Sequence, residues 1–382
     1  MEKIELNEPQ RIKSIDIFRG LCMAWMVLNH LIDWWLIKEF SWVHSVTIMI
    51  LDPIGASGFL FISGVSITLS YRRRMIKEKN FKKNNSKVLK NSYFLRAFFI
   101  FIIAISYNIP IAIYLINPSY IWSWFILLTI AVSMFIMWPL FHTSKTFRLI
   151  LGLFIIVGNQ FLLIFLQPYK GEFNLLGVLY HIFYHNISQD PILTFFPFFL
   201  FGTIFGDILF TSYINNNSIN KKLVLKKKLI LPSILVGISL IFIGVIIKFP
   251  DFLIRQNVSW IIYSIGIETL FLSLLFLFEK FMFLDTKKNF KLLFYYSYYS
   301  LTVYLSHYLL YFLFFRKLNP FNIWFFILAT FILLGLLLRL IYKKFKGNAS
   351  VKIQISRLSR ILAIRIENRK HKKKENQIRL QI

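Results

Sequence analysis

The sequence is poor in two kinds of residue, cysteine and acid. Cys22 is the one cysteine in 382 residues, which excludes a disulfide within the chain and a zinc site built from several thiolates. Asp and Glu number 17 against 45 Lys and Arg, for a formal net charge of +28. In a soluble chain such an excess indicates a nucleic-acid binder, so the positions of the charges decide what they mean.

Apolar residues are abundant instead. They make up 57% of the chain, with 43 Phe and a mean hydropathy of +0.61, against about 45–50% apolar residues in ordinary soluble proteins. A helix needs about 20 residues to cross a membrane, and apolar runs near that length recur along the whole chain. The pattern predicts an all-α, polytopic membrane protein of about ten transmembrane helices. The expected spans are 17–37, 52–71, 93–115, 120–141, 148–167, 191–210, 229–248, 259–279, 296–315 and 321–342.

The basic residues lie between these runs. Lys and Arg concentrate in every second connecting segment, beginning with residues 1–14. By the positive-inside rule both termini are cytoplasmic, and the chain is a multi-pass protein of the cell membrane. The first run lacks a small-residue cleavage site, so we expect it to remain as a helix. Topology accounts for the charge, and no nucleic-acid partner is expected.

The carboxyl-terminal region differs from the rest. Residues 1–342 are interpreted as the transmembrane domain and residues 343–382 as a basic cytoplasmic tail. Within the tail, apolar side chains recur at helical spacing among arginines, at Leu358, Ile361, Leu362 and Ile366. The tail is therefore either an amphipathic helix on the anionic inner leaflet, with membrane lipids as partners, or a disordered basic segment.

Ionisable residues inside membrane spans are costly and mark candidate functional sites. The first span holds the densest set. Asp16 and Arg19 are three residues apart and share a helix face, and His30 follows eleven residues after Arg19, roughly 16 Å further along that face. Asn29 and Asp33 flank His30. An imidazole on such a polar stripe is a candidate base or nucleophile near neutral pH.

Most other histidines fall on or near the outer side, at His44, His181, His185 and His307. They are candidates for an outward-facing cavity. His181 and His185 are four residues apart, a spacing at which two helical histidines can bind zinc. Because neither a cysteine cluster nor a His-Glu-x-x-His frame accompanies them, we expect no metal.

Several segments resemble a transmembrane acyltransferase superfamily, and in particular the heparan-alpha-glucosaminide N-acetyltransferase family. The resemblance is carried by residues 11–30 with Asp16, Arg19 and Gly20, by Asp52 and the Gly-x-Ser turn that begins at Gly64, by the glycine-bearing segment from Asp190 to Gly206, by Trp260, and by Ser300-Leu-x-x-Tyr304-x-x-His307. Members of that family join cytosolic acetyl-CoA to an amine or hydroxyl of a sugar across the membrane, using a histidine.

The resemblance implies the same reaction here. The phosphates of CoA would bind near Asp16 and Arg19 and at a basic loop, and the acceptor would lie among outer residues. The implied loop residues are Arg72, Arg73 and Arg74, and the implied acceptor residues are His181, His185, Asp190, Trp260 and His307. Asn29 and Asp52 join the candidate catalytic group.

The sequence also departs from the heparan-type pattern. In those enzymes an Asn occupies the position of His30, and the acting histidine follows the first helix, where this chain has His44. The acting histidine is therefore His30 or His44, with His30 favoured by its place on the polar stripe. The acceptor group, amine or hydroxyl, stays open.

Two other classes compete with the acyltransferase. A transporter or flippase for a lipid-linked sugar would use the polar stripe as a path, but the sequence lacks paired Gly or Pro breaks in matching halves. A non-catalytic scaffold would use only the basic tail. Lipid-facing aromatic residues would also permit a homodimer.

Overall fold

The structure is a computed structural model that describes residues 11–80, 86–185, 189–214, 220–281 and 291–379. Within these ranges the chain is helical, and its one β-bridge joins Leu36 to Leu318. The first helices are α1 (Lys13–Trp35), α2 (Ser41–Leu51), α3 (Ala56–Asn80), α4 (Ser86–Tyr114), α5 (Ile126–Leu140), α6 (Lys145–Leu166) and α7 (Leu175–Phe183). The others are α8 (Ile192–Leu209), α9 (Lys221–Leu225), α10 (Leu231–Ile247), α11 (Val258–Phe281), α12 (Lys291–Tyr298), α13 (Ser300–Ser306), α14 (Ile323–Phe345) and α15 (Val351–Arg379).

The predicted all-α membrane fold is confirmed. Eight helical segments of the described chain are long and apolar enough to cross a membrane. Two of the ten expected spans differ in form. The span expected at 120–141 contains α5, which at 15 residues is about 22 Å long. The span expected at 296–315 is divided into α12, α13 and the 3₁₀ turn His307–Phe312.

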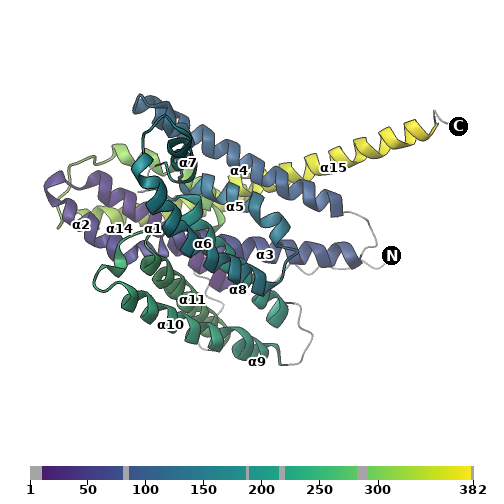
Figure 1. Cartoon of the computed structure of the whole chain (residues 1–382), viewed down its shortest axis with the longest axis horizontal. Helices are drawn as coiled ribbons and strands as arrows, with labels where there is room; N and C mark the ends of the chain where they lie inside the picture. The colour runs from purple at the N-terminus through teal and green to yellow at the C-terminus, as the bar shows by residue number, and fades with distance from the viewer. Residues whose placement is uncertain (1–10, 81–85, 186–188, 215–219, 282–290, 380–382) are drawn as a thin grey trace.

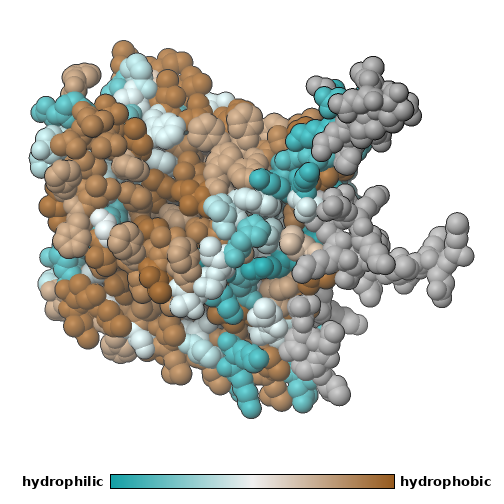
Figure 2. All heavy atoms as spheres, turned by 45° about the vertical axis from the view of Figure 1, so that its right-hand side comes forward, coloured by the Kyte–Doolittle hydropathy of each residue, from teal (hydrophilic) through white to brown (hydrophobic). Residues whose placement is uncertain are grey.

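The two ends of the chain lie at the same end of the bundle (Figure 1). Hydrophilic residues gather at that end, while the rest of the visible face is largely hydrophobic (Figure 2). This distribution matches a bundle whose apolar sides face lipid and whose basic end faces water. By the positive-inside rule we take the end that carries both termini as cytoplasmic.

Helices α3 and α8 approach each other closely through glycine. A Cβ on Gly64 would lie 2.1 Å from the carbonyl oxygen of Phe199, and one on Gly202 would lie 2.1 Å from that of Phe61. Small residues at a membrane helix interface let the backbones pack against each other. This contact explains why glycine recurs along both apolar segments.

The interruption of the ninth predicted span places two parts of the chain together. Backbone N–H groups of Arg316 and Leu318 donate to the carbonyls of Trp34 and Trp35, both at 2.9 Å, at the end of α1. The Trp35 indole also donates to the carbonyl of Leu310 at 2.9 Å. These bonds attach the segment after His307 to the end of the helix that carries the polar stripe.

The tail beyond residue 342 continues α14 and then forms α15, which lies beside α4 (Figure 1). Ile355 and Ala363 of α15 are buried against the bundle, and Glu367 accepts a hydrogen bond from Asn91 of α4 at 2.6 Å. The tail is thus a docked helix over residues 351–379. Its contact with lipid, and the division of the chain at residue 342, stay predictions.

Candidate active site

A cavity of about 430 Å³ lies among α1, α3, α4, α5, α13 and α15. Its size falls within the range of small-molecule sites, about 300–1,000 Å³. One part of the wall is apolar, from residues such as Phe59, Ile100 and Met134. The other part is basic and is formed by Arg19, Arg74, Arg96, Lys352, Arg357 and Arg360. We call this space the cationic cavity.

The lining residues of the cationic cavity include no Asp or Glu. The nearest acid in the polar stripe is Asp16, whose carboxylate lies 3.9 Å from the Arg19 guanidinium and also pairs with Arg11. The wall of the cavity therefore carries six cations and no acid of its own. A bound anion would be stabilised there, since opposite charges attract strongly where water is partly excluded.

Arg19 is held in place by hydroxyl groups. Its guanidinium donates to Ser66 of α3 and, at 3.4 Å, to Ser297 of α12. Ser297 in turn donates to Asp16 at 3.0 Å. This network fixes one cation at the wall of the cavity and brings α1, α3 and α12 together around it.

The cavity meets a chain of aromatic rings at Tyr304. The Tyr304 ring centroid is 5.5 Å from that of His307, which is 4.9 Å from His30, which is 5.0 Å from Trp34. The predicted histidines His30 and His307 are thus direct neighbours, and one aromatic side chain separates them from the cavity. Among the described residues His30 has no hydrogen-bond partner.

The tautomer of His307 follows from its contacts. His307 Nδ1 lies in hydrogen-bond contact with the carbonyl of Tyr304. Because a carbonyl only accepts, Nδ1 carries the proton and Nε2 carries the lone pair. His307 is 3% exposed, and its Nε2 has no hydrogen-bond partner in the described part of the chain. A neutral imidazole with an available acceptor nitrogen therefore lies beside His30.

His44 lies in a different setting, on α2. Its Nε2 is 3.1 Å from Asn29 Oδ1, and its Nδ1 is 3.9 Å from Asp33 Oδ1. Both ring nitrogens of His44 thus face partners from α1. The Asp33 side chain is 45% exposed, so this group lies at the open side of the His30 cluster.

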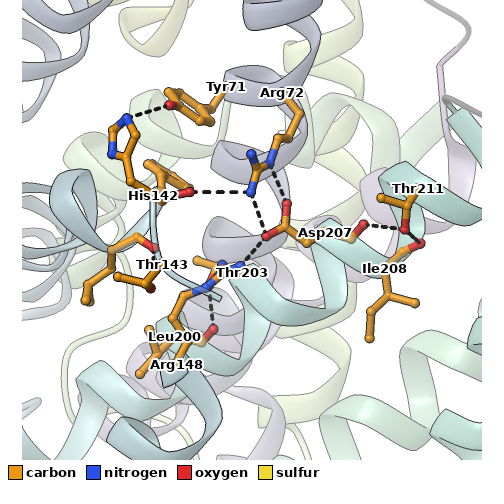
Figure 3. A network of polar contacts seen from close by, with 12 residues as sticks. Tyr71, Arg72, His142, Thr143, Arg148, Leu200, Thr203, Asp207, Ile208 and Thr211 are labelled. Atoms are coloured by element: carbon orange, nitrogen blue, oxygen red, sulfur yellow. Dashed lines mark hydrogen bonds and ion pairs between the residues drawn. The ribbon is translucent and has the colours of Figure 1, made fainter. Parts of the chain in front are cut away.

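Arg72 does not line the cationic cavity. It forms an ion pair with Asp207 of α8 at 2.7 Å, and Arg148 of α6 pairs with the other oxygen of the same carboxylate (Figure 3). Arg148 is 1% exposed and also donates to Thr203 at 2.9 Å. We call Arg72, Arg148 and Asp207 the buried ion-pair cluster. The three arginines expected in a loop lie instead within α3. Arg73 is partly buried outside the cavity, so of the three only Arg74 lines it.

Asp52 and Asp190 are brought together by a residue that the sequence did not single out. Arg255 lies 3.0 Å from the Asp52 carboxylate and 2.7 Å from that of Asp190. Trp260 is 1% exposed, and its ring packs against Phe195 at 5.8 Å. These residues form a separate cluster outside the cavity lining, and α8 contributes no lining residue.

His181 and His185 are neighbours, with ring centroids 4.8 Å apart at the end of α7. Burial, followed by the adjacent His181, lowers the pKa of His185 to about 4. His185 Nε2 is 3.5 Å from the Ser119 hydroxyl. In the described part of the chain no group of three or more His, Cys, Asp or Glu side chains gathers as a metal site would require.

Four cations of the cavity wall were also missed by the sequence argument: Arg96, Lys352, Arg357 and Arg360. Arg96 lies inside the expected span 93–115, and the others lie in the tail, where the argument followed the spacing of the apolar side chains. The available signal was spacing, since positions 352, 356, 357 and 360 return to one face of a helix. Nothing in the sequence indicates that this face turns toward the cavity.

Residues 12–342 match the family model of an acyltransferase domain, acyltransferase 3. The chain belongs to the acyltransferase 3 family. The match covers most of the chain and confirms the superfamily indicated by the sequence motifs, a membrane acyltransferase rather than a transporter or a scaffold. No curated protein matches this acyltransferase. The family match ends before α15, which supplies three of the six cations around the cavity.

Proposed function

We propose that this acyltransferase moves an acetyl group from cytosolic acetyl-CoA to an amine or hydroxyl of a sugar on the outer side of the cell membrane. The observation that carries the proposal is the cationic cavity, whose wall has six basic side chains and no acid. CoA combines a polyanionic nucleotide with a narrow, uncharged pantetheine arm whose alkyl segments can contact an apolar wall. The basic and apolar parts of the cavity match these two parts.

The position of the histidines supports the direction of transfer. Tyr304 lies at one edge of the cavity. The His307 ring is next to Tyr304, and the His30 ring is next to His307. Asp33, close to His44, is exposed beyond them. A thioester carried past Tyr304 would meet an acceptor that approaches from the Asp33 side. Neither the acceptor nor the nucleotide would need to cross the membrane.

In the proposed reaction His30 acts as general base. It takes the proton of the acceptor hydroxyl or amine as that group attacks the thioester carbonyl. Collapse of the tetrahedral intermediate breaks the carbon–sulfur bond and releases CoA as a thiolate, which takes up the proton that His30 removed from the acceptor. His307, neutral and with its Nε2 lone pair available, is positioned to share the proton with His30. His44, held by Asn29 and facing Asp33, is the alternative base.

The proposal includes a relationship between this protein and the heparan-alpha-glucosaminide N-acetyltransferases. A sugar acceptor follows from that relation, and the acyltransferase 3 match does not specify one. Arg255 pairs with both Asp52 and Asp190, and it would hold these two side chains in place near the acceptor on the outer side.

The test is binding and transfer of acetyl-CoA with purified protein in detergent. We expect saturable binding by the wild type, weakened roughly tenfold in Arg19→Ala because a charge-assisted contact to phosphate is lost. His30→Ala should keep this binding and lose transfer by about 10²–10⁴-fold, the usual contribution of a general base.

Arg339→Ala is the matched control, because Arg339 is exposed and does not line the cavity. Absence of acetyl-CoA binding by a folded wild-type protein would overturn the proposed donor. Full transfer by His30→Ala, with loss in His44→Ala, would move the base to His44.

A further inference from the structure

The basic helix α15 closes one side of the cationic cavity, although it lies beyond the segment that matches the family. Lys352, Arg357 and Arg360 line the cavity from this helix, while Arg19, Arg74 and Arg96 line it from the bundle. Half of the positive charge around the cavity therefore comes from a part of the chain that the family model does not describe.

The position of α15 is fixed by specific bonds to the broken ninth span. The Val351 N–H donates to the Thr302 hydroxyl at 3.2 Å, and the Lys352 ammonium donates to the carbonyl of Ser297 at 2.8 Å. Ser297 also contacts Arg19, so the two halves of the basic wall share a residue. Figure 1 shows α15 continuing beside α4 toward the end of the bundle that carries both termini.

The three cations of α15 differ in exposure. Lys352 is partly buried and held by a carbonyl, whereas Arg357 and Arg360 are exposed at the edge of the same cavity. Arg357 also donates to the Asn348 side chain at 2.7 Å, which orients its guanidinium. An anion that enters from water would contact the two arginines first and the lysine deeper.

We infer that α15 is the phosphate-binding element of the donor site, in which Lys352, Arg357 and Arg360 hold the diphosphate and 3′-phosphate of CoA. The inference rests on the proposed function. Guanidinium groups bind phosphate oxygens through paired N–H donors, so the two arginines suit a terminal phosphate ester. α15 then selects CoA over donors that lack the nucleotide phosphates. An anionic lipid headgroup offers the same phosphate chemistry, and the experiment separates the two.

The test compares Arg357→Gln/Arg360→Gln with Arg365→Gln/Arg369→Gln, a pair of exposed arginines on the same helix that do not line the cavity. Each full-length protein is placed in nanodiscs of phosphatidylcholine, and the dissociation constants of CoA, 3′-dephospho-CoA and pantetheine are measured. A second set of nanodiscs contains phosphatidylglycerol. Elution volume and thermal unfolding check that each variant is folded.

We expect Arg357→Gln/Arg360→Gln to weaken CoA binding by roughly tenfold to a hundredfold, one charged hydrogen bond being worth about a tenfold change. The preference for CoA over 3′-dephospho-CoA should fall, pantetheine binding should not change, and the control pair should match the wild type. Equal CoA binding by both double variants would overturn the inference and leave the proposed function standing. Wild type that binds no CoA would overturn both.

The lipid arm decides between the two sources of phosphate. If phosphatidylglycerol competes with CoA in the wild type and the double variant loses only this competition, the arginines bind a lipid headgroup and the inference is wrong. If phosphatidylglycerol leaves the CoA dissociation constant unchanged, the arginines serve the nucleotide.

Discussion

Two groups of basic residues in this protein have opposite surroundings. In the buried ion-pair cluster, Arg72 and Arg148 share the carboxylate of Asp207, and every charge has a partner from another helix (Figure 3). In the cationic cavity, basic side chains surround an open space with no acid in its wall. The first arrangement joins α3, α6 and α8. The second gathers basic side chains of α1, α3, α4 and α15 around one cavity.

The comparison separates structural from binding residues more sharply than sequence position does. Arg72 and Arg74 are two residues apart, yet the first faces Asp207 and the second lines the cavity. A buried ion pair contributes through its partner, and loss of that partner leaves a costly unpaired charge. A cation in the cavity wall is expected to contribute to ligand binding, and not to the stability of the ligand-free protein. Substitutions in the two groups should therefore have opposite effects on stability.

The largest effect is expected from Asp207→Ala. Removing this carboxylate leaves Arg72 and the 1%-exposed Arg148 facing each other without an acid between them. The free energy of unfolding should fall by about 3–5 kcal/mol. Thermal or denaturant unfolding in detergent measures the change, and Glu172→Ala, at an exposed loop position, should stay within about 0.5 kcal/mol of the wild type. A loss below about 1 kcal/mol in Asp207→Ala would contradict the structural role of the cluster.

Arg96→Met should act in the reverse direction. Arg96 lines the cavity, and its Nε has no hydrogen-bond partner among the described residues. Met keeps much of the side-chain length and removes one of six like charges, so the ligand-free protein should gain up to about 1 kcal/mol of stability. Acetyl-CoA binding should weaken roughly tenfold.

The measurements for Arg96→Met are thermal unfolding without ligand and an acetyl-CoA binding isotherm on the same preparation. A variant that is less stable and binds acetyl-CoA as tightly as the wild type would place Arg96 with the structural arginines.

The sequence predicts the fold well because its signals are local. Apolar runs of membrane length and the alternation of basic segments depend on neighbouring residues only. One exception involves distant residues. The expected ninth span is divided into α12, α13 and a 3₁₀ turn, and the segment that follows it, Arg316–Leu318, bonds to the end of α1, about 280 positions away in the chain.

The sequence predicts only part of the candidate site, because several of the site's contacts join residues that are far apart in the chain. The face shared by Asp16, Arg19 and His30 follows from helical spacing, and the structure places Arg19 at the cavity with Asp16 beside it. Spacing does not tell which arginine of residues 72–74 meets an acid, since Asp207 is more than 130 residues away. It also cannot orient α15, whose basic face is set by bonds to α12 and α13.

The outer side offers a second comparison, between a histidine pair with a hydrogen-bond contact to Ser119 and a histidine without a hydrogen bond. The His181 and His185 rings meet edge to face, and His185 is packed near Tyr120 with ring centroids 4.9 Å apart. His30 has no hydrogen-bond partner in the described chain and lies beside the unpartnered Nε2 of His307. The first pair has the surroundings of packing residues, although acceptor binding by it stays a prediction.

The smallest effect is expected from His185→Gln and depends on pH. Burial, with the neighbouring His181, lowers the pKa of His185 from its ordinary value of 6.5 to about 4 in the folded protein. Between these values the unfolded chain binds a proton that the folded chain does not, so stability is lost as pH falls from about 6.5 toward 4. After allowance for the partial exposure of the ring, the loss due to His185 is on the order of 1 kcal/mol.

Thermal unfolding at pH 7 and pH 5 should thus show a smaller drop in stability for His185→Gln than for the wild type. His142→Gln, at an exposed histidine on another helix end, should show the wild-type drop. Equal drops in His185→Gln and the wild type would mean that the ring is hydrated, as an accessible ligand for an acceptor would be.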